Sequence, residues 1–176
     1  MKYYTGSRFR LGSLPGGLRL ILVLYLSITL LGFWLAAAKY WFRGSASGKL
    51  FTASGSQTYY VDRWTMQDPL LAGEADTPIY WLIDMTHPHL FTIPIVLLVL
   101  CHLVQLCRGP QGFKSGLYLG AFGGLILTFG LPWFVGVLPL ASILIPLGGM
   151  LLVLSGTALC LWPLYELFAK DPARPT

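Results

Sequence analysis

The fold is decided by the stretch PHLFTIPIVLLVLCHLVQLC, residues 88–107, in which twenty consecutive residues include no carboxylate, lysine or arginine. A helix of about 20 apolar residues crosses the roughly 30 Å hydrocarbon core of a bilayer. Residues 20–38, 116–136 and 141–168 have the same character. The 176-residue chain is 55% hydrophobic and only 11% charged, which is outside the usual range of soluble domains. The sequence therefore predicts an all-α integral membrane protein, a single four-helix bundle.

The segments between these helices predict how the chain crosses the membrane. Residues 1–19 form a basic arm, residues 39–87 a long loop that ends in an interfacial segment, and residues 169–176 a short tail. Basic residues precede the first helix and occur in the 108–115 loop and the tail, as expected of cytoplasmic segments. We therefore expect a bacterial-type inner (cytoplasmic) membrane, with both termini cytoplasmic and the 39–87 loop exported. Because the +5 charge is scattered over helix ends, membrane lipid is the expected partner and nucleic acid is not.

Three local features predict details of the bundle. Pro88 suits the first position of a helix, where its missing N–H costs nothing, so we expect the second helix to begin there. Gly116, Gly120 and Gly124 repeat every four residues and should form a smooth strip against another helix. Glu166 should reach water at the end of the fourth helix, beside Lys170.

The three histidines of the chain, His87, His89 and His102, all lie in or beside the second helix. An ionisable side chain inside a membrane is costly, so His102 is a functional candidate. His102 could ligate haem or contact quinone, with Gln105 or a carbonyl bonded to its other ring nitrogen. It could equally hydrogen-bond Thr128, Ser155 or a backbone carbonyl of a neighbouring helix. Both interpretations stay open at this point.

The spacing of the histidines adds to the redox interpretation. His89 and His102 are separated by roughly 20 Å along a helix axis, and His87 and His102 by about 22 Å. In this spacing the helix resembles those of di-haem membrane cytochromes b, in which two histidines on one helix each hold a haem near opposite faces of the membrane. The resemblance implies haem b at His89 and His102. Those families supply opposing ligands from a second histidine-bearing helix, which this chain lacks. The resemblance therefore implies a homodimer or another redox subunit as partner, or Met85 or Met150 as the further ligand.

A second cluster, D-x-x-H-x-H, comprises Asp84, His87 and His89. Histidine beside a carboxylate titrates in the range that quinol oxidation needs, so Asp84 and His87 are candidate catalytic proton acceptors. One carboxylate and two imidazoles also suit a metal ion with an open position, held by all three residues. The remaining interpretation is a polar interfacial turn in which Asp84 caps the helix.

The leading functional hypothesis is a small integral membrane subunit of an electron-transfer assembly, which binds haem b or contacts quinone or quinol through the second helix. The alternative is a non-catalytic membrane anchor or assembly subunit of a larger complex. The sequence contains no C-x-x-C-H, G-x-S-x-G or H-E-x-x-H motif, which excludes c-type haem attachment and the common hydrolase classes that carry these motifs. Whether the protein is an enzyme is left open.

Overall fold

The structure, a computed structural model, describes residues 11, 14–46, 78–134, 137–138 and 140–169. Within these residues every regular element is helical: α1 (Gly16–Ala46), α4 (Pro78–Leu106), α5 (Gln111–Phe129), the short 3₁₀ helix η4 (Leu131–Phe134) and α6 (Ala141–Phe168). The prediction of an all-α four-helix membrane bundle is confirmed. The predicted 39–87 loop is shorter than expected at both ends, because residues 39–46 belong to α1 and residues 78–87 to α4. Residues 47–77, and all of the predicted 169–176 tail except Ala169, lie outside the described residues.

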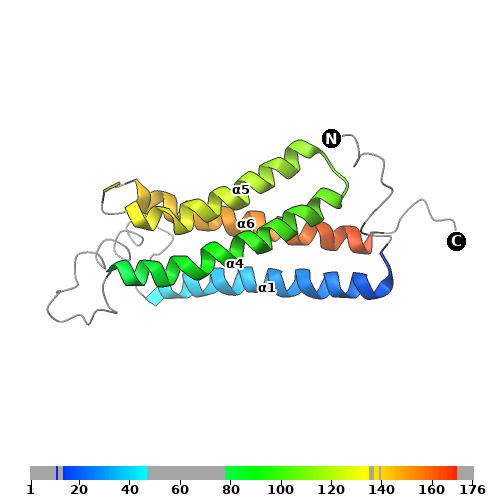
Figure 1. The fold of residues 1–176 in the computed structure, drawn as a ribbon, viewed down its shortest axis with the longest axis horizontal. Helices are drawn as coiled ribbons and strands as arrows, with labels where there is room; N and C mark the ends of the chain where they lie inside the picture. The colour runs from blue at the N-terminus through cyan, green and yellow to red at the C-terminus, as the bar shows by residue number, and fades with distance from the viewer. Residues whose placement is uncertain (1–10, 12–13, 47–77, 135–136, 139, 170–176) are drawn as a thin grey trace.

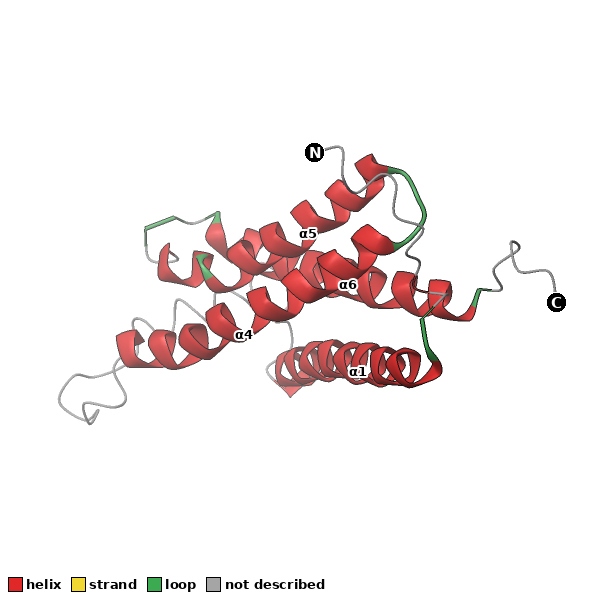
Figure 2. Cartoon of the chain, turned by 45° about the vertical axis from the view of Figure 1, so that its right-hand side comes forward, coloured by secondary structure: helices red, strands yellow, loops and turns green. Residues whose placement is uncertain are grey.

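The four long helices alternate in direction along the bundle (Figure 1). The start of α1, the α4–α5 connection and the end of α6 lie at one end of the molecule, and the α5–α6 connection lies at the other. Both ribbon views place α4 and α6 between α1 and α5 (Figures 1 and 2). The main partner of α1 is α6, and the ring of Phe33 lies so near Gly156 that a Cβ added there would be 3.0 Å from it.

Three of the helices are long and apolar enough to cross a membrane, over Gly16–Ala38, Leu82–Leu106 and Ile143–Phe168. The fourth, α5, has 19 residues and begins with the polar run QGFKS. At 1.5 Å per residue it is about 28 Å long, and it lies alongside α6 (Figure 1). Large apolar side chains are exposed on the outside of all four helices, as at Ile28, Leu98, Leu119 and Leu154. Such a surface is stable against lipid chains and not against water.

The second helix begins at Pro78, ten residues earlier than predicted, and continues through Pro88 and Pro94. Each proline removes one backbone hydrogen bond, yet membrane helices tolerate proline because neighbouring groups take up the freed positions. The carbonyls that lose an N–H donor are those of Asp84 and Leu90, and Thr92 Oγ1 separately donates to the carbonyl oxygen of Pro88 at 2.6 Å. The prediction that Pro88 starts the helix is therefore wrong, and Asp84, His87 and His89 all lie on one continuous helix.

The third helix is also displaced from its predicted range of 116–136, because it covers Gln111–Phe129 and gives way to η4. Pro132 lies in η4, where the tighter helix tolerates a residue that cannot donate a backbone hydrogen bond. The indole N–H of Trp133 donates to Thr86 Oγ1 at 3.2 Å, which joins this turn to α4.

The predicted glycine contact is confirmed for Gly120 and Gly124, and the neighbouring helix is α6 of the same chain. A Cβ added at Gly120 would lie 2.5 Å from Ser155 Oγ, and one at Gly124 would lie 2.6 Å from the backbone nitrogen of Leu152. Gly116 does not take part, since a Cβ added there would have no atom within 4 Å. The contact between α5 and α6 is therefore closest towards the end of α5.

The glycine on the α6 side of this contact is Gly148, a residue whose part in it was not predicted. A Cβ there would overlap the Cβ of Leu127 and lie 3.0 Å from the backbone nitrogen of Thr128. Because glycines on both helices are needed, the backbones approach one another more closely than any side chain would allow.

Candidate functional site on the outer face of α4

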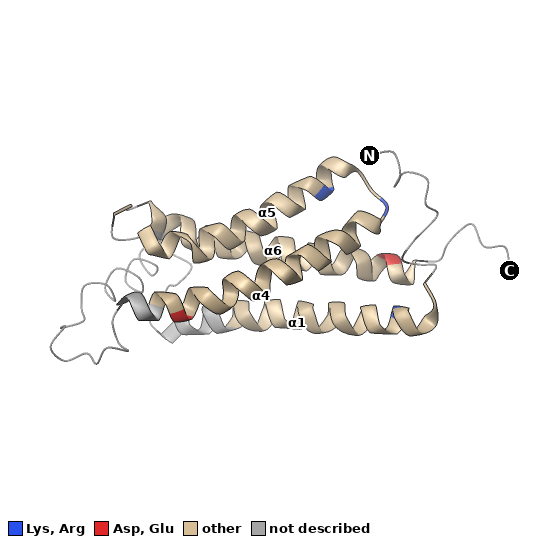
Figure 3. Ribbon diagram, viewed as in Figure 1, with Lys and Arg blue, Asp and Glu red and all other residues tan. Residues whose placement is uncertain are grey.

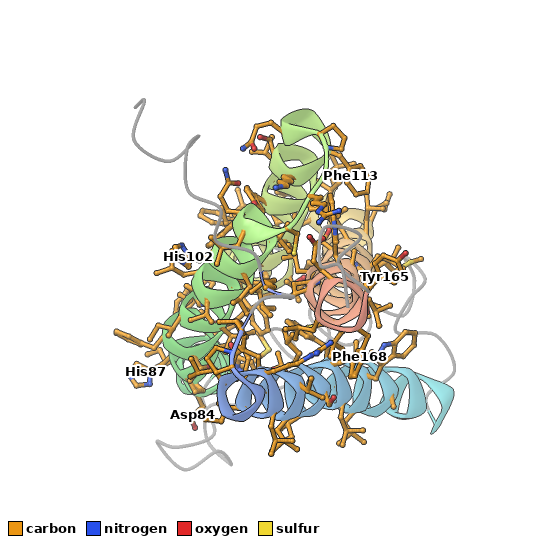
Figure 4. All side chains as sticks on the ribbon, turned by 90° about the vertical axis from the view of Figure 1, so that its right-hand side faces the viewer. Asp84, His87, His102, Phe113, Tyr165 and Phe168 are labelled. Carbon is orange, nitrogen blue, oxygen red and sulfur yellow. The ribbon has the colours of Figure 1, made fainter. Side chains whose placement is uncertain are left out.

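His102 lies on the side of α4 that faces away from the other helices (Figure 4). Its side chain is exposed, and among the described residues it makes no hydrogen bond or ring contact. The interpretation that it bonds Thr128 or Ser155 is wrong: Thr128 Oγ1 donates to the carbonyl of Gly124 at 2.7 Å, and Ser155 is buried against Gly120. An imidazole in this position can be satisfied only by a group outside the described chain.

Gln105 is not the partner of His102 either. Its side-chain oxygen accepts from the Tyr118 hydroxyl at 3.0 Å, and its amide pairs with that of Gln111 at 3.3 Å. Gln105 therefore joins α4 to α5, and both ring nitrogens of His102 remain available for a ligand or a partner.

His102 belongs to a continuous exposed strip on α4, which we call the outer face of α4. The strip consists of residues that follow one another at intervals of three or four and are all exposed: Asp84, His87, Phe91, Ile95, Leu98 and His102. At about 100° per residue they fall within roughly 80° of arc on an ideal helix. Figure 4 shows the polar members, Asp84, His87 and His102, directed away from α6. The rings of His87 and Phe91 meet edge to face at 5.4 Å.

His89 lies on another side of α4, turned by about 140° from His102 on an ideal helix. Its ring stacks on Phe129 with centroids 4.6 Å apart and planes at 19°. Its Nδ1 is 2.5 Å from the carbonyl oxygen of Met85. His89 thus contributes to the packing of α4 on α5, and the histidine that shares an outward face with His102 is His87. Haem ligation by His89 stays a prediction.

The cluster Asp84, His87 and His89 is divided between two sides of the helix. The described part of the chain contains no group of three His, Cys, Asp or Glu residues placed to hold a metal ion. The structure therefore does not assemble the metal site that the sequence suggested. Residues two positions apart are separated by about 160° around a helix, and here His87 is directed outward and His89 towards Phe129. Asp84 and His87 remain together, one turn apart and both exposed, and their role as quinol proton acceptors stays a prediction.

A buried lysine holds the opposite end of α4 in place. Lys114 is 4% exposed, and its ammonium donates to the carbonyls of Cys107 at 2.6 Å and Gln105 at 3.3 Å. These carbonyls end α4, where a cation satisfies acceptors that lack a helical partner and opposes the helix dipole. From the sequence, Lys114 was expected only as a loop charge; its place within one turn of a helix end was the available signal.

Glu166 does not simply reach water, as the sequence predicted. Its Oε2 accepts from the backbone N–H of Arg108 at 3.1 Å, and its Oε1 lies 3.7 Å from Arg108 Nε. Lys170, its predicted neighbour, lies outside the described residues. The contact fixes the α4–α5 connection on the end of α6.

Gly109 in the same connection has φ of 140°, a conformation that side-chain-bearing residues rarely adopt. A Cβ there would also overlap the indole ring of Trp162. The connection therefore needs glycine for two separate reasons.

The described charges are divided between the two ends of the bundle (Figure 3). Arg19 near the start of α1, Arg108 and Lys114 at the α4–α5 connection and Glu166 near the end of α6 lie at one end of the bundle, and Asp84 near the start of α4 lies towards the other. An apolar middle between two polar ends, formed by alternating helices, defines a multi-pass membrane protein. Residues 51–174 match the family Aq_1264_TM, a transmembrane helical domain. The chain belongs to this family, and the matched region includes α4, α5 and α6. No curated protein and no solved structure matches the chain.

Proposed function

We propose that this multi-pass membrane protein is a small subunit of an electron-transfer assembly, in which the outer face of α4 binds haem b through His102 or contacts a quinone. The observation that carries the proposal is the exposed imidazole of His102, which has no partner among the described residues. A polar group facing hydrocarbon is costly unless something satisfies it. A haem iron, a quinone oxygen or a polar group of a partner can do so.

One chain supplies at most one ligand to each haem on this face. His102 and His87 are about 22 Å apart along α4, so His102 can hold a haem near one face of the membrane while His87 meets quinol near the other. The second ligand of the haem comes from another redox subunit or from a second copy. The resemblance to di-haem cytochromes b supports a haem at His102.

At the other end of the outer face, Asp84 and His87 are suited to accept protons from a quinol. They are exposed and one turn apart, so a carboxylate and an imidazole can both face the hydroxyl group of a quinol, and either is a group that can accept its proton. The edge of Phe91, which meets His87, gives an apolar surface against which a quinol ring can lie.

The second candidate function is a non-catalytic anchor or assembly subunit. The same exposed strip favours it, since polar side chains directed outward from a membrane helix form hydrogen bonds with the helices of partner subunits. In that case His102 binds a partner residue and no chromophore.

Substitution of His102 separates the two functions. The protein purified in mild detergent should show a reduced haem b spectrum, and His102→Ala should remove one haem's absorbance at unchanged yield, because alanine is favoured in helices and in the membrane. Leu98→Ala is the matched control, since it truncates an equally outward residue that cannot ligate iron. His87→Ala and His89→Ala identify the histidine of any second chromophore. A colourless wild-type protein without quinol-dependent activity, in stable association with other subunits, would establish the anchor function instead.

We also propose that the protein lies in a bacterial-type inner membrane, with both termini cytoplasmic and residues 39–87 exported. Support comes from the positions of Arg19 near the start of α1 and of Arg108 and Lys114 at the α4–α5 connection, all at one end of the bundle, as expected of a cytoplasmic end under the positive-inside rule.

Cysteine labelling of intact cells tests this orientation. In a background without native cysteines, Ser56→Cys should react with an impermeant maleimide added outside, and Ser115→Cys should react only after the cells are opened. Ser115 suits this purpose because it is exposed near the start of α5. Labelling of Ser115→Cys but not Ser56→Cys from outside would reverse the topology.

A further inference from the structure

We infer that two copies of this chain pair through the outer face of α4, as a parallel dimer whose two-fold axis is perpendicular to the membrane. The inference deepens the second candidate function, that of an anchor or assembly subunit, and it rests on that function for His102 as a residue that bonds a partner. The contact itself requires no cofactor.

The outer face has the dimensions of a helix-to-helix contact. From Asp84 to His102 it extends over about 27 Å, close to the full hydrocarbon thickness. Its six residues recur at intervals of three or four, which keeps them on one side of the helix. The three central members are large and well exposed: Phe91 at 65%, Ile95 at 63% and Leu98 at 66%. No described helix covers this side of α4 (Figure 4).

The polar residues at the two ends identify the partner as a second copy. Chains inserted in the same orientation present each residue at the same depth, so across a two-fold axis His102 meets His102. A neutral imidazole has one donor and one acceptor nitrogen, and is therefore complementary to another neutral imidazole. One turn separates Asp84 from His87, so the carboxylate of each copy can accept a hydrogen bond from His87 of the other. A different subunit would have to carry matching polar groups at both depths.

Disulfide cross-linking in native membranes tests the contact. In a background in which Cys101, Cys107 and Cys160 are replaced, Leu98→Cys should form a product of twice the chain mass under copper–phenanthroline oxidation. Ile126→Cys on α5 and Leu154→Cys on α6 are the matched controls, because at 65% and 61% they are as exposed as Leu98 but lie on other helices. The dimer band at Leu98→Cys should exceed that of either control at least fivefold.

Three results would overturn the inference: no dimer from Leu98→Cys, equal dimer from the control positions, or linkage of Leu98→Cys to a different protein. The outcome is independent of the spectra. A colourless protein that cross-links through Leu98→Cys retains the dimer and loses the haem proposal. A protein with a haem spectrum that fails to cross-link there retains the electron-transfer function and loses the dimer.

Discussion

Replacing Gly124 with leucine should prevent α5 from packing on α6 and should lower the free energy of unfolding by about 3 kcal/mol or more. A Cβ at this position would lie 2.6 Å from the Leu152 nitrogen and 2.8 Å from the Gly148 oxygen. Both are backbone atoms, which cannot rotate away as a side chain can. The helices would have to separate, and the contacts along their whole length would weaken together.

Gly116→Leu is the control for this experiment, since it makes the same change on the same helix where no atom lies within 4 Å of the added Cβ. Leucine is favoured over glycine in a helix by up to about 1 kcal/mol, so this variant should be as stable as the wild type. The measurements are the thermal midpoint in detergent and the monodisperse fraction on size exclusion. Equal midpoints for the two variants would show that the α5–α6 approach is not as close as the structure has it.

Replacing Gly109 with alanine should destabilise the protein by about 2 to 4 kcal/mol, because backbone strain and steric overlap coincide. A residue with a Cβ at φ of 140° carries backbone strain of about 1–3 kcal/mol, and the new methyl group would overlap the Trp162 ring. The connection should move away from α6 and break the contact between Arg108 and Glu166.

A double-mutant cycle separates the two costs. Trp162→Ala in the Gly109→Ala background should restore the part of the lost stability that is due to steric overlap. The part that is due to backbone strain should remain. Gly112→Ala, with no atom within 4 Å of the added Cβ, is the nearby control and should leave the thermal midpoint unchanged. A Gly109→Ala protein with the same thermal midpoint as the wild type would contradict the described conformation of the α4–α5 connection.

The helical membrane fold was predictable because four long apolar segments admit few other structures. The helix boundaries were less predictable than the fold, and Pro88 shows why. Proline favours the first turn of a helix, where its missing N–H costs nothing, but membrane helices tolerate proline in their interior, and α4 continues through Pro88 and Pro94. Gly124 illustrates an intermediate case: its spacing predicted a close contact, but nothing in the sequence identified Gly148 as the other half.

The candidate site was predictable as a set of residues and not as an arrangement. Helical periodicity alone gives roughly 60° between His87 and His102 and about 140° between His89 and His102, and the continuous helix preserves this relation. Which side of α4 faces the bundle could not be predicted, because lipid-facing and core-facing side chains in a membrane protein are both apolar. Lys114 was missed for a related reason, since its carbonyl partners are defined only once α4 ends at Leu106 and the chain turns back.

The packing of α1 on α6 has a consequence for biosynthesis. The ribosome makes α1 first among these helices and α6 last, so α1 meets its main neighbour only after α4 and α5 have also been translated. Until then Phe33 lacks Gly156, the residue against which its ring packs. The α5–α6 hairpin, by contrast, unites two segments made in succession. Completion of the bundle is therefore a late event, in which a helix that has waited in the membrane docks on an already formed hairpin.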